Sequence, residues 1–132
     1  MSNINITNID LGNVILSDAE FDDDVIAFAG ADDLAEGTIL ARTTATGKLG
    51  IYATDGAGGL DEPVAVLTYP VSATGEGDVP VRVLVAGKVR KERLIIDADG
   101  DDSNITKAIE DELRGVSIIP VNVDELNILD NQ

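Results

Sequence analysis

Short apolar segments separated by turns are the feature of this sequence that most restricts its fold. Each segment is rich in Val, Ile and Leu, and the turns between them consist mainly of Gly, Pro, Asp and Thr. The segments are Thr38–Arg42, Leu49–Tyr52, Pro63–Tyr69, Val81–Val85, Leu94–Ile96 and Ser117–Ile119, and Pro70 and Pro120 are placed to end two of them. Such runs are typical of strands in a β-rich module. The sequence therefore predicts a mainly β fold with short strands and long loops.

A helical pattern interrupts these strands near residues 105–114. Four apolar residues fall on one face at helical spacing, namely Ile105, Ala108, Ile109 and Leu113. Ser103 or Asn104 is placed to cap the amino end, and Gly115 to take the left-handed conformation that often follows a helix. We therefore expect one short helix near residues 105–114, in an α+β fold that is dominated by strands.

The beginning of the chain predicts an extended arm. Apolar and polar residues alternate from Ile4 to Thr7, which suits a strand with one buried face. Because no nearby segment offers a hairpin partner, we expect residues 1–24 to form an arm that pairs with something else. Its candidate contact residues are Ile4, Ile6, Ile9 and Leu11. Residues 25–132 would then form a single β-rich domain, and the alternative is an arm folded back onto that domain.

The charge of the chain is strongly negative. Asp and Glu total 25 against 9 Lys and Arg, which gives a net charge of −16. Phosphate contacts need dense Lys and Arg, so this charge argues against nucleic-acid binding and disfavours an anionic membrane surface. Residues 1–16 carry no Lys or Arg and no continuous apolar run. We therefore expect neither a secretory signal nor a membrane helix there, and a soluble protein made in a cytoplasm.

The residue types that are missing exclude several kinds of chemistry. The chain contains no Cys and no His, so it can form no disulfide, no thiol nucleophile, no Ser-His-Asp triad and no imidazole-ligated metal site. Aromatic residues are only 3 % of the chain, which leaves few rings to stack on a sugar beside a pair of catalytic carboxylates. A small carboxylate-based hydrolase is therefore a weak alternative, and we expect no enzyme and no cofactor.

The acidic stretch Asp97–Asp102 invites comparison with a calcium loop. An EF-hand loop places acids at positions 1, 3 and 5, Gly at 6 and Glu at 12. The first three acids are present, but Asp102 and Ala108 occupy the two positions that need Gly and Glu. We therefore predict no metal site and expect a solvated turn ahead of the helix. A small acidic binding module of a surface or tail structure, with or without calcium, stays open as the alternative function.

Positive charge is concentrated in one segment. Its four residues are Lys88, Arg90, Lys91 and Arg93. One interpretation is a solvated segment that offsets neighbouring acids, and the other is a local positive patch that contacts an acidic partner. The sequence does not separate the two interpretations, so all four residues are candidates for an electrostatic contact.

The order of motifs in the middle of the chain resembles that of the lambda-type phage head decoration proteins. The motifs are Glu36–Leu40, Thr46–Leu49, Pro63–Leu67, Val81–Val85, Gly87–Val89 and Leu113–Ile118. They are similar to the family's "G-x-[IV]-L" strand, "G-K" hairpin, "A-V-x-[IL]-L" strand, valine-rich strand, "G-x-V" turn and closing "L-x-x-G-[IV]" segment. The resemblance extends from about Ala35 to Ile119.

The resemblance implies both a fold and a function. The fold is a small module of the β-clip kind. The function is that of a homotrimer on the outer surface of an expanded phage head, where it cements neighbouring major capsid protein subunits. The N-terminal arm would become ordered on the shell and add strands to the capsid protein. The protein would reside in the virion, after assembly in the host cytoplasm, and the resemblance implies neither catalysis nor a cofactor.

Overall fold

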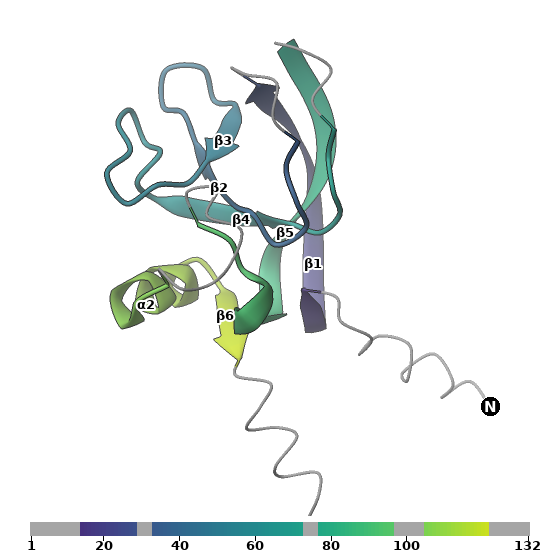
Figure 1. Ribbon diagram of the computed structural model, residues 1–132, viewed down its shortest axis with the longest axis vertical. Coiled ribbons are helices and arrows are strands. Elements are labelled where there is room, and N and C mark those ends of the chain that lie inside the picture. The colour runs from purple at the N-terminus through teal and green to yellow at the C-terminus, as the bar shows by residue number, and fades with distance from the viewer. Residues whose placement is uncertain (1–13, 29–32, 73–76, 97–104, 122–132) are drawn as a thin grey trace, which may run out of the picture.

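The computed structural model describes residues 14–28, 33–72, 77–96 and 105–121. Its strands are β1 (Ile15–Phe28), β2 (Ile39–Arg42), β3 (Leu49–Ile51), β4 (Pro63–Leu67), β5 (Gly77–Arg90) and β6 (Ile118–Val121). A 3₁₀ turn, η1 (Lys91–Arg93), follows β5, and helix α2 (Lys107–Gly115) precedes β6. Strands thus dominate the described residues and α2 is a single short helix, which confirms the predicted mainly β fold (Figure 1).

The strands close into a small barrel. They follow the order β1-β3-β2-β4-β5, and the additional pairing of β1 with β5 completes the ring. The contact between β1 and β3 is a short parallel one at Ile26 and Leu49. By contrast, β1 and β5 form a long antiparallel ribbon, which we call the β1–β5 ribbon. It extends below the barrel, where β6 adds to β5 in parallel and α2 lies beside it (Figure 1).

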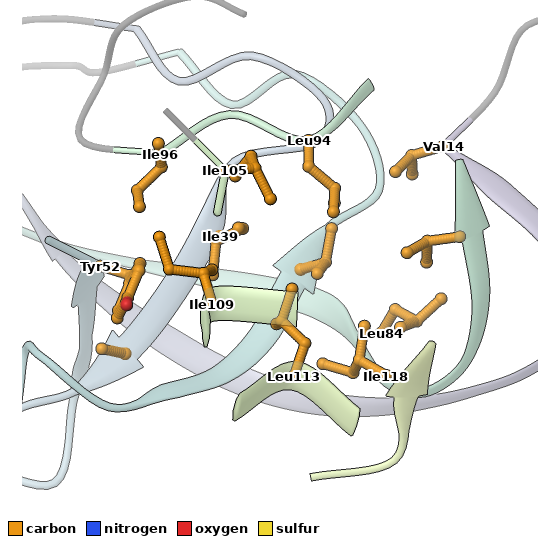
Figure 2. Packing of buried hydrophobic residues seen from close by; sticks show 13 residues of the cluster. Val14, Ile39, Tyr52, Leu84, Leu94, Ile96, Ile105, Ile109, Leu113 and Ile118 are labelled. Atoms are coloured by element: carbon orange, nitrogen blue, oxygen red, sulfur yellow. The ribbon is translucent and has the colours of Figure 1, made fainter. Parts of the chain in front are cut away.

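Two hydrophobic clusters share the strands β2 and β4 between them. The first gathers around the inside of the ring and comprises Ile26, Leu34, Leu40, Leu49, Ala65, Leu67, Val71, Val81 and Val83. The second lies between the ring and α2 and comprises Val14, Ile39, Ala41, Tyr52, Val66, Leu84, Val89, Leu94, Ile96, Ile105, Ile109, Leu113 and Ile118 (Figure 2). Alternate residues of β2 enter alternate clusters. This is why its sequence is a continuous apolar run rather than an alternation.

Helix α2 forms where the apolar spacing predicts it, but its ends differ from the prediction. Thr106 is the N-cap, and its hydroxyl oxygen accepts a hydrogen bond from the backbone N–H three residues later. The predicted caps Ser103 and Asn104 are therefore wrong, because the helix begins later. Gly115 is the last helical residue, and Ser117 takes the left-handed conformation instead, with φ at 73°. The chain turns there because β6 begins at the next residue.

The N-terminal arm is shorter than predicted. Residues 15–24 belong to β1 and pair with β5 of the same chain, as in the pair Asp24–Val81. The expectation that these residues pair with something else is therefore wrong. Their partner follows them after more than fifty residues, so the local sequence cannot reveal it. Residues 1–13 lie outside the described residues, and an arm there stays a prediction.

Two further strands extend beyond their predicted limits. The predicted strand Val81–Val85 is the middle of β5, which continues into the basic segment as far as Arg90. Pro120 was expected to end the last strand, but it lies inside β6 and pairs with Val89. A proline is tolerated there because β6 is an edge strand of the described sheet.

Candidate interaction surface

The start of the described chain is anchored to the domain. Val14 is fully buried, and its backbone N–H donates a hydrogen bond of 3.0 Å to the Glu36 carboxylate. The Val14 carbonyl accepts a hydrogen bond of 2.8 Å from the Arg90 backbone N–H. The predicted arm residues lie outside the described residues, namely Ile4, Ile6, Ile9 and Leu11. Whatever these residues contact, they are tethered at a fixed point on the lower end of the β1–β5 ribbon.

The predicted basic patch is divided by the fold. Lys88 is exposed on β5, and its Nζ lies 4.0 Å from an Asp18 carboxylate oxygen. Arg93 is exposed in η1, but Arg90 is only 7 % exposed and offers little surface to a partner. Lys91 and Arg93 lie in η1, beyond the end of β5, so the four cations do not continue along one strand face. An acidic partner for the exposed members stays a prediction.

Lys91, the fourth member, belongs to an ion-pair cluster around a buried carboxylate. Glu110 of α2 has a side chain only 5 % exposed, and Lys91 Nζ lies 3.1 Å from its Oε2. Arg114 Nη2 lies 3.7 Å from the other carboxylate oxygen of Glu110, Oε1, and Lys107 Nζ lies 4.0 Å from the same oxygen. The cluster ties η1 to the helix. Helical spacing predicts the contacts of Glu110 within α2, but no sequence signal points to Lys91.

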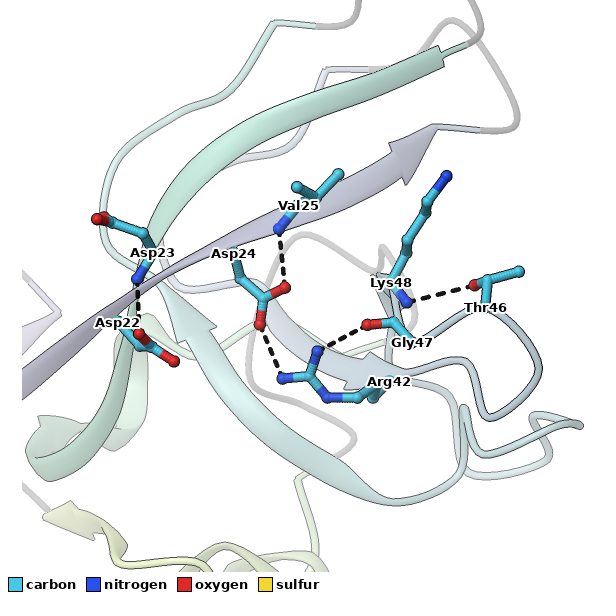
Figure 3. Close-up of polar contacts among 8 residues, drawn as sticks. All are labelled: Asp22, Asp23, Asp24, Val25, Arg42, Thr46, Gly47 and Lys48. Carbon is cyan, nitrogen blue, oxygen red and sulfur yellow. Dashed lines mark hydrogen bonds and ion pairs between the residues drawn. The ribbon is translucent and has the colours of Figure 1, made fainter.

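Several carboxylates of β1 form ion pairs with residues of other strands. The guanidinium Nη2 of Arg42 in β2 lies 2.8 Å from Asp24 Oδ2, and Nη1 donates a hydrogen bond to the Gly47 carbonyl (Figure 3). The hydrogen bond from Arg42 holds the pKa of the Asp24 carboxyl below its usual value of 3.8, despite the opposing effect of burial. The same contact raises the pKa of Arg42. The acidic run at the end of the predicted arm is thus partly neutralised within the domain.

An exposed aromatic patch lies on the β1–β5 ribbon. Phe21 is 37 % exposed and Tyr69 is 41 % exposed, in a chain with two Phe and two Tyr. The Arg82 guanidinium carbon lies 5.6 Å from the centre of the Phe21 ring, and Asp23 lies 3.4 Å from the same guanidinium. The Arg82 backbone N–H donates a hydrogen bond of 2.9 Å to the Tyr69 hydroxyl. Aromatic residues and Arg are enriched in protein interfaces. The sequence gives no sign of this patch, because its members come from three separate segments.

A surface pocket of ≈ 490 Å³ lies beside α2 and contains two carboxylates, Asp61 and Glu112. The Tyr52 hydroxyl donates a hydrogen bond of 3.3 Å to Glu112 Oε1. Burial, and then the negative charge of Glu112, raise the pKa of Tyr52 to about 12. Tyr52 is therefore neutral at ordinary pH, and its ring belongs to the cluster under the helix.

The described residues show neither a metal cluster nor a membrane span. Within these ranges no group of three or more Asp and Glu side chains is placed to hold a metal ion. No described helix is long and apolar enough to cross a membrane. The acidic stretch Asp97–Asp102 lies outside the described residues, so its predicted lack of a metal site stays a prediction.

Comparison with known proteins connects this fold to one family. No curated protein matches the chain. The model of the family described as "Bacteriophage lambda head decoration protein D" matches residues 6–118, which is most of the chain. The matched range includes β1 to β5, α2 and the first residue of β6. The chain therefore belongs to the bacteriophage lambda head decoration protein D family, a family of structural proteins of the phage head.

Proposed function

We propose that the chain is a cementing protein that binds as a homotrimer to the outer surface of an expanded phage head. In this role it holds neighbouring subunits of the major capsid protein together, after assembly in the host cytoplasm. The family match over residues 6–118 carries the proposal, because it covers nearly the whole described domain. The trimer, the outer position and the capsid partner are what the family resemblance implies. The proposal includes no catalysis and no cofactor.

The attachment segment in this proposal is residues 1–13. One edge of strand β1 is already paired with β5 along most of its length, so β1 is part of the domain and is not a free arm. The sequence before it alternates apolar and polar residues, so that in an extended strand Ile4 and Ile6 would share one face and Asn5 and Thr7 the other. The anchor at Val14 fixes where this segment leaves the domain. A tethered strand of this kind suits β-augmentation of a partner sheet.

Electrostatic repulsion opposes the proposed assembly. Each chain carries a net charge of −16, and a trimer brings three of these charges together. Salt screens such repulsion, with a Debye length of about 10 Å at 0.1 M. We therefore expect binding to the shell to tighten as salt is raised. Weaker binding at raised salt would contradict this and would point to contacts of Lys88 and Arg93 with acids of the capsid.

The experiment that tests the attachment segment is co-sedimentation with the cognate empty expanded heads. The double variant Ile4→Asp/Ile6→Asp places two charges on the apolar face of the segment. It should abolish attachment and leave the domain folded by circular dichroism.

The matched control is Asn5→Asp/Thr7→Asp, which adds the same two charges to the opposite face and should retain most attachment. Equal loss in both double variants would show that charge, and not the apolar face, decides attachment. Preserved attachment of the Ile4→Asp/Ile6→Asp variant would refute the proposed role of the arm.

A further inference from the structure

We infer that, within the described residues, the exposed edges of the β1–β5 ribbon and of β6 resist strand addition, because side chains and prolines remove several of their outward backbone donors. Exposed sheet edges are templates on which other chains can add strands. The inference deepens the proposed function: if strands pair between this chain and the shell, the chain donates the strand and does not accept one.

The side of β1 that faces away from β5 is capped by its own aspartates, at Asp23 on the free edge and at Val25 beside the short contact of Ile26 with β3. The Asp23 N–H donates a hydrogen bond of 3.0 Å to the Asp22 carboxylate, and the Val25 N–H donates one of 2.9 Å to the Asp24 carboxylate (Figure 3). Val25 pairs with Pro80, which has no N–H, so this pair cannot exchange two ladder hydrogen bonds. Both capped donors therefore point away from β5, and each already has an acceptor.

The first half of β1 is closed in a different way. The pairing of β1 with β5 shifts register at three places between Ile15 and Phe21. Asp18 takes a left-handed conformation there, with φ at 57°, opposite Gly87 with φ at 130°. A Cβ atom at Gly87 would lie 2.8 Å from the Ala19 Cα, so the bulge fits only against glycine. Such bulges bend an edge strand and break the regular spacing that an added strand needs.

The opposite edge of the ribbon is closed by a tyrosine and a proline. In β5 the Arg82 N–H donates its hydrogen bond to the Tyr69 hydroxyl and not to a strand. Two residues earlier, Pro80 supplies no donor at all. Arg82 and Pro80 are on the same edge because residues two apart in a strand point their backbone groups the same way.

The outer edge of β6 follows the same principle. The Gly87 N–H donates a hydrogen bond to the Ser117 carbonyl. In the parallel ladder that follows, the backbone N–H and C=O groups of alternate residues point toward β5, namely those of Ser117, Ile119 and Val121. Pro120 therefore turns its nitrogen outward, where a donor would otherwise be free. This explains why a proline is found within β6 rather than after it.

The test opens one donor on each edge of the ribbon in the full chain. The variant Asp22→Ala/Tyr69→Phe frees the N–H groups of Asp23 and Arg82. Sedimentation velocity over a wide concentration range should show association beyond that of the wild type, at concentrations at least about tenfold lower. The matched control Asp22→Asn/Tyr69→Phe removes the same charge but keeps a side-chain acceptor at residue 22. It should associate less than the alanine variant.

Two outcomes would overturn the inference. One is an alanine variant that is folded by circular dichroism but sediments as the wild type does. The other comes from amide exchange of the wild type measured by NMR, which does not depend on any variant folding. Capped donors should exchange at least about tenfold more slowly than exposed amides, so unprotected amides at Asp23, Val25 and Arg82 would refute the caps. Both readouts use the isolated chain, so they stand or fall separately from binding to the shell.

Discussion

The substitution Gly37→Ala tests how tightly the segment before β2 is packed against the segment after η1. Gly37 has φ at 95°, and a Cβ atom there would lie 1.8 Å from the Arg93 carbonyl oxygen. Real Cβ atoms keep more than 3.0 Å from such an atom, so the two backbones must separate by more than about 1 Å. The Gly37 N–H donates to the Leu67 carbonyl, and the Gly37 carbonyl accepts from the Ile95 N–H. Separation therefore disrupts these hydrogen bonds.

The expected loss of stability combines two effects. A left-handed conformation costs a residue with a side chain about 1–2 kcal/mol relative to glycine. Weakening the two hydrogen bonds costs about 1 kcal/mol each, and displaced core contacts add to this. The free energy of unfolding should fall by about 3–5 kcal/mol, in the range of severe single substitutions. For a chain of this size that corresponds to a Tm lower by roughly 10–20 °C.

The assay is urea and thermal unfolding followed by circular dichroism. Gly47→Ala is the matched control, because Gly47 has φ at 75° and no atom within 4 Å of the added Cβ. It carries the conformational cost alone and should lose about 1–2 kcal/mol. If Gly37→Ala is no less stable than Gly47→Ala, the close approach of Gly37 to Arg93 has no energetic consequence and the expected loss is wrong.

Three further predictions concern the packing beside α2. Leu113→Ala should destabilise the domain by about 2–5 kcal/mol in urea unfolding, because Leu113 is fully buried, whereas Val116→Ala at an exposed position should change stability by less than about 0.5 kcal/mol. A spectroscopic titration of phenolate absorbance should show a component near pH 12 that is lost in Tyr52→Phe. Since folding raises this pKa from 10.0 to about 12, the stability that Tyr52 contributes should be present below pH 10 and disappear as the pH rises toward 12; unchanged stability across that window would contradict the assignment. Glu110→Gln should cost about 1–3 kcal/mol, less than a fully buried pair, because its cations are partly exposed; a neutral effect would show that the cluster does not stabilise the fold.

Local patterns predict the parts of this fold whose partners are close in sequence. Strands β2, β3 and β4 lie within the apolar runs that predict them, because turn residues bound each run and neighbours pair with neighbours. Strand β1 could not be predicted in this way. Its segment from Asp18 to Asp24 is rich in acids, which are poor strand formers, and pairing with distant β5 overrides that preference.

The interaction surface was less predictable than the fold. The basic segment is contiguous in sequence, but the fold buries Arg90, and the ion pair with Glu110 engages Lys91. The aromatic patch depends on contacts among Phe21, Tyr69 and Arg82, which lie in different strands or loops. Side-chain contacts between distant segments follow from the closed sheet, and a single sequence does not show which segments meet.

Co-sedimentation with expanded and unexpanded empty heads is the most direct test of the proposed cementing function. The two proteins to compare are the full chain and a chain that begins at Val14, which removes the proposed arm and keeps the anchored start of the domain. We predict that the full chain binds expanded heads alone and that the shortened chain loses this binding. If the full chain binds neither kind of head, the proposed cementing function is contradicted.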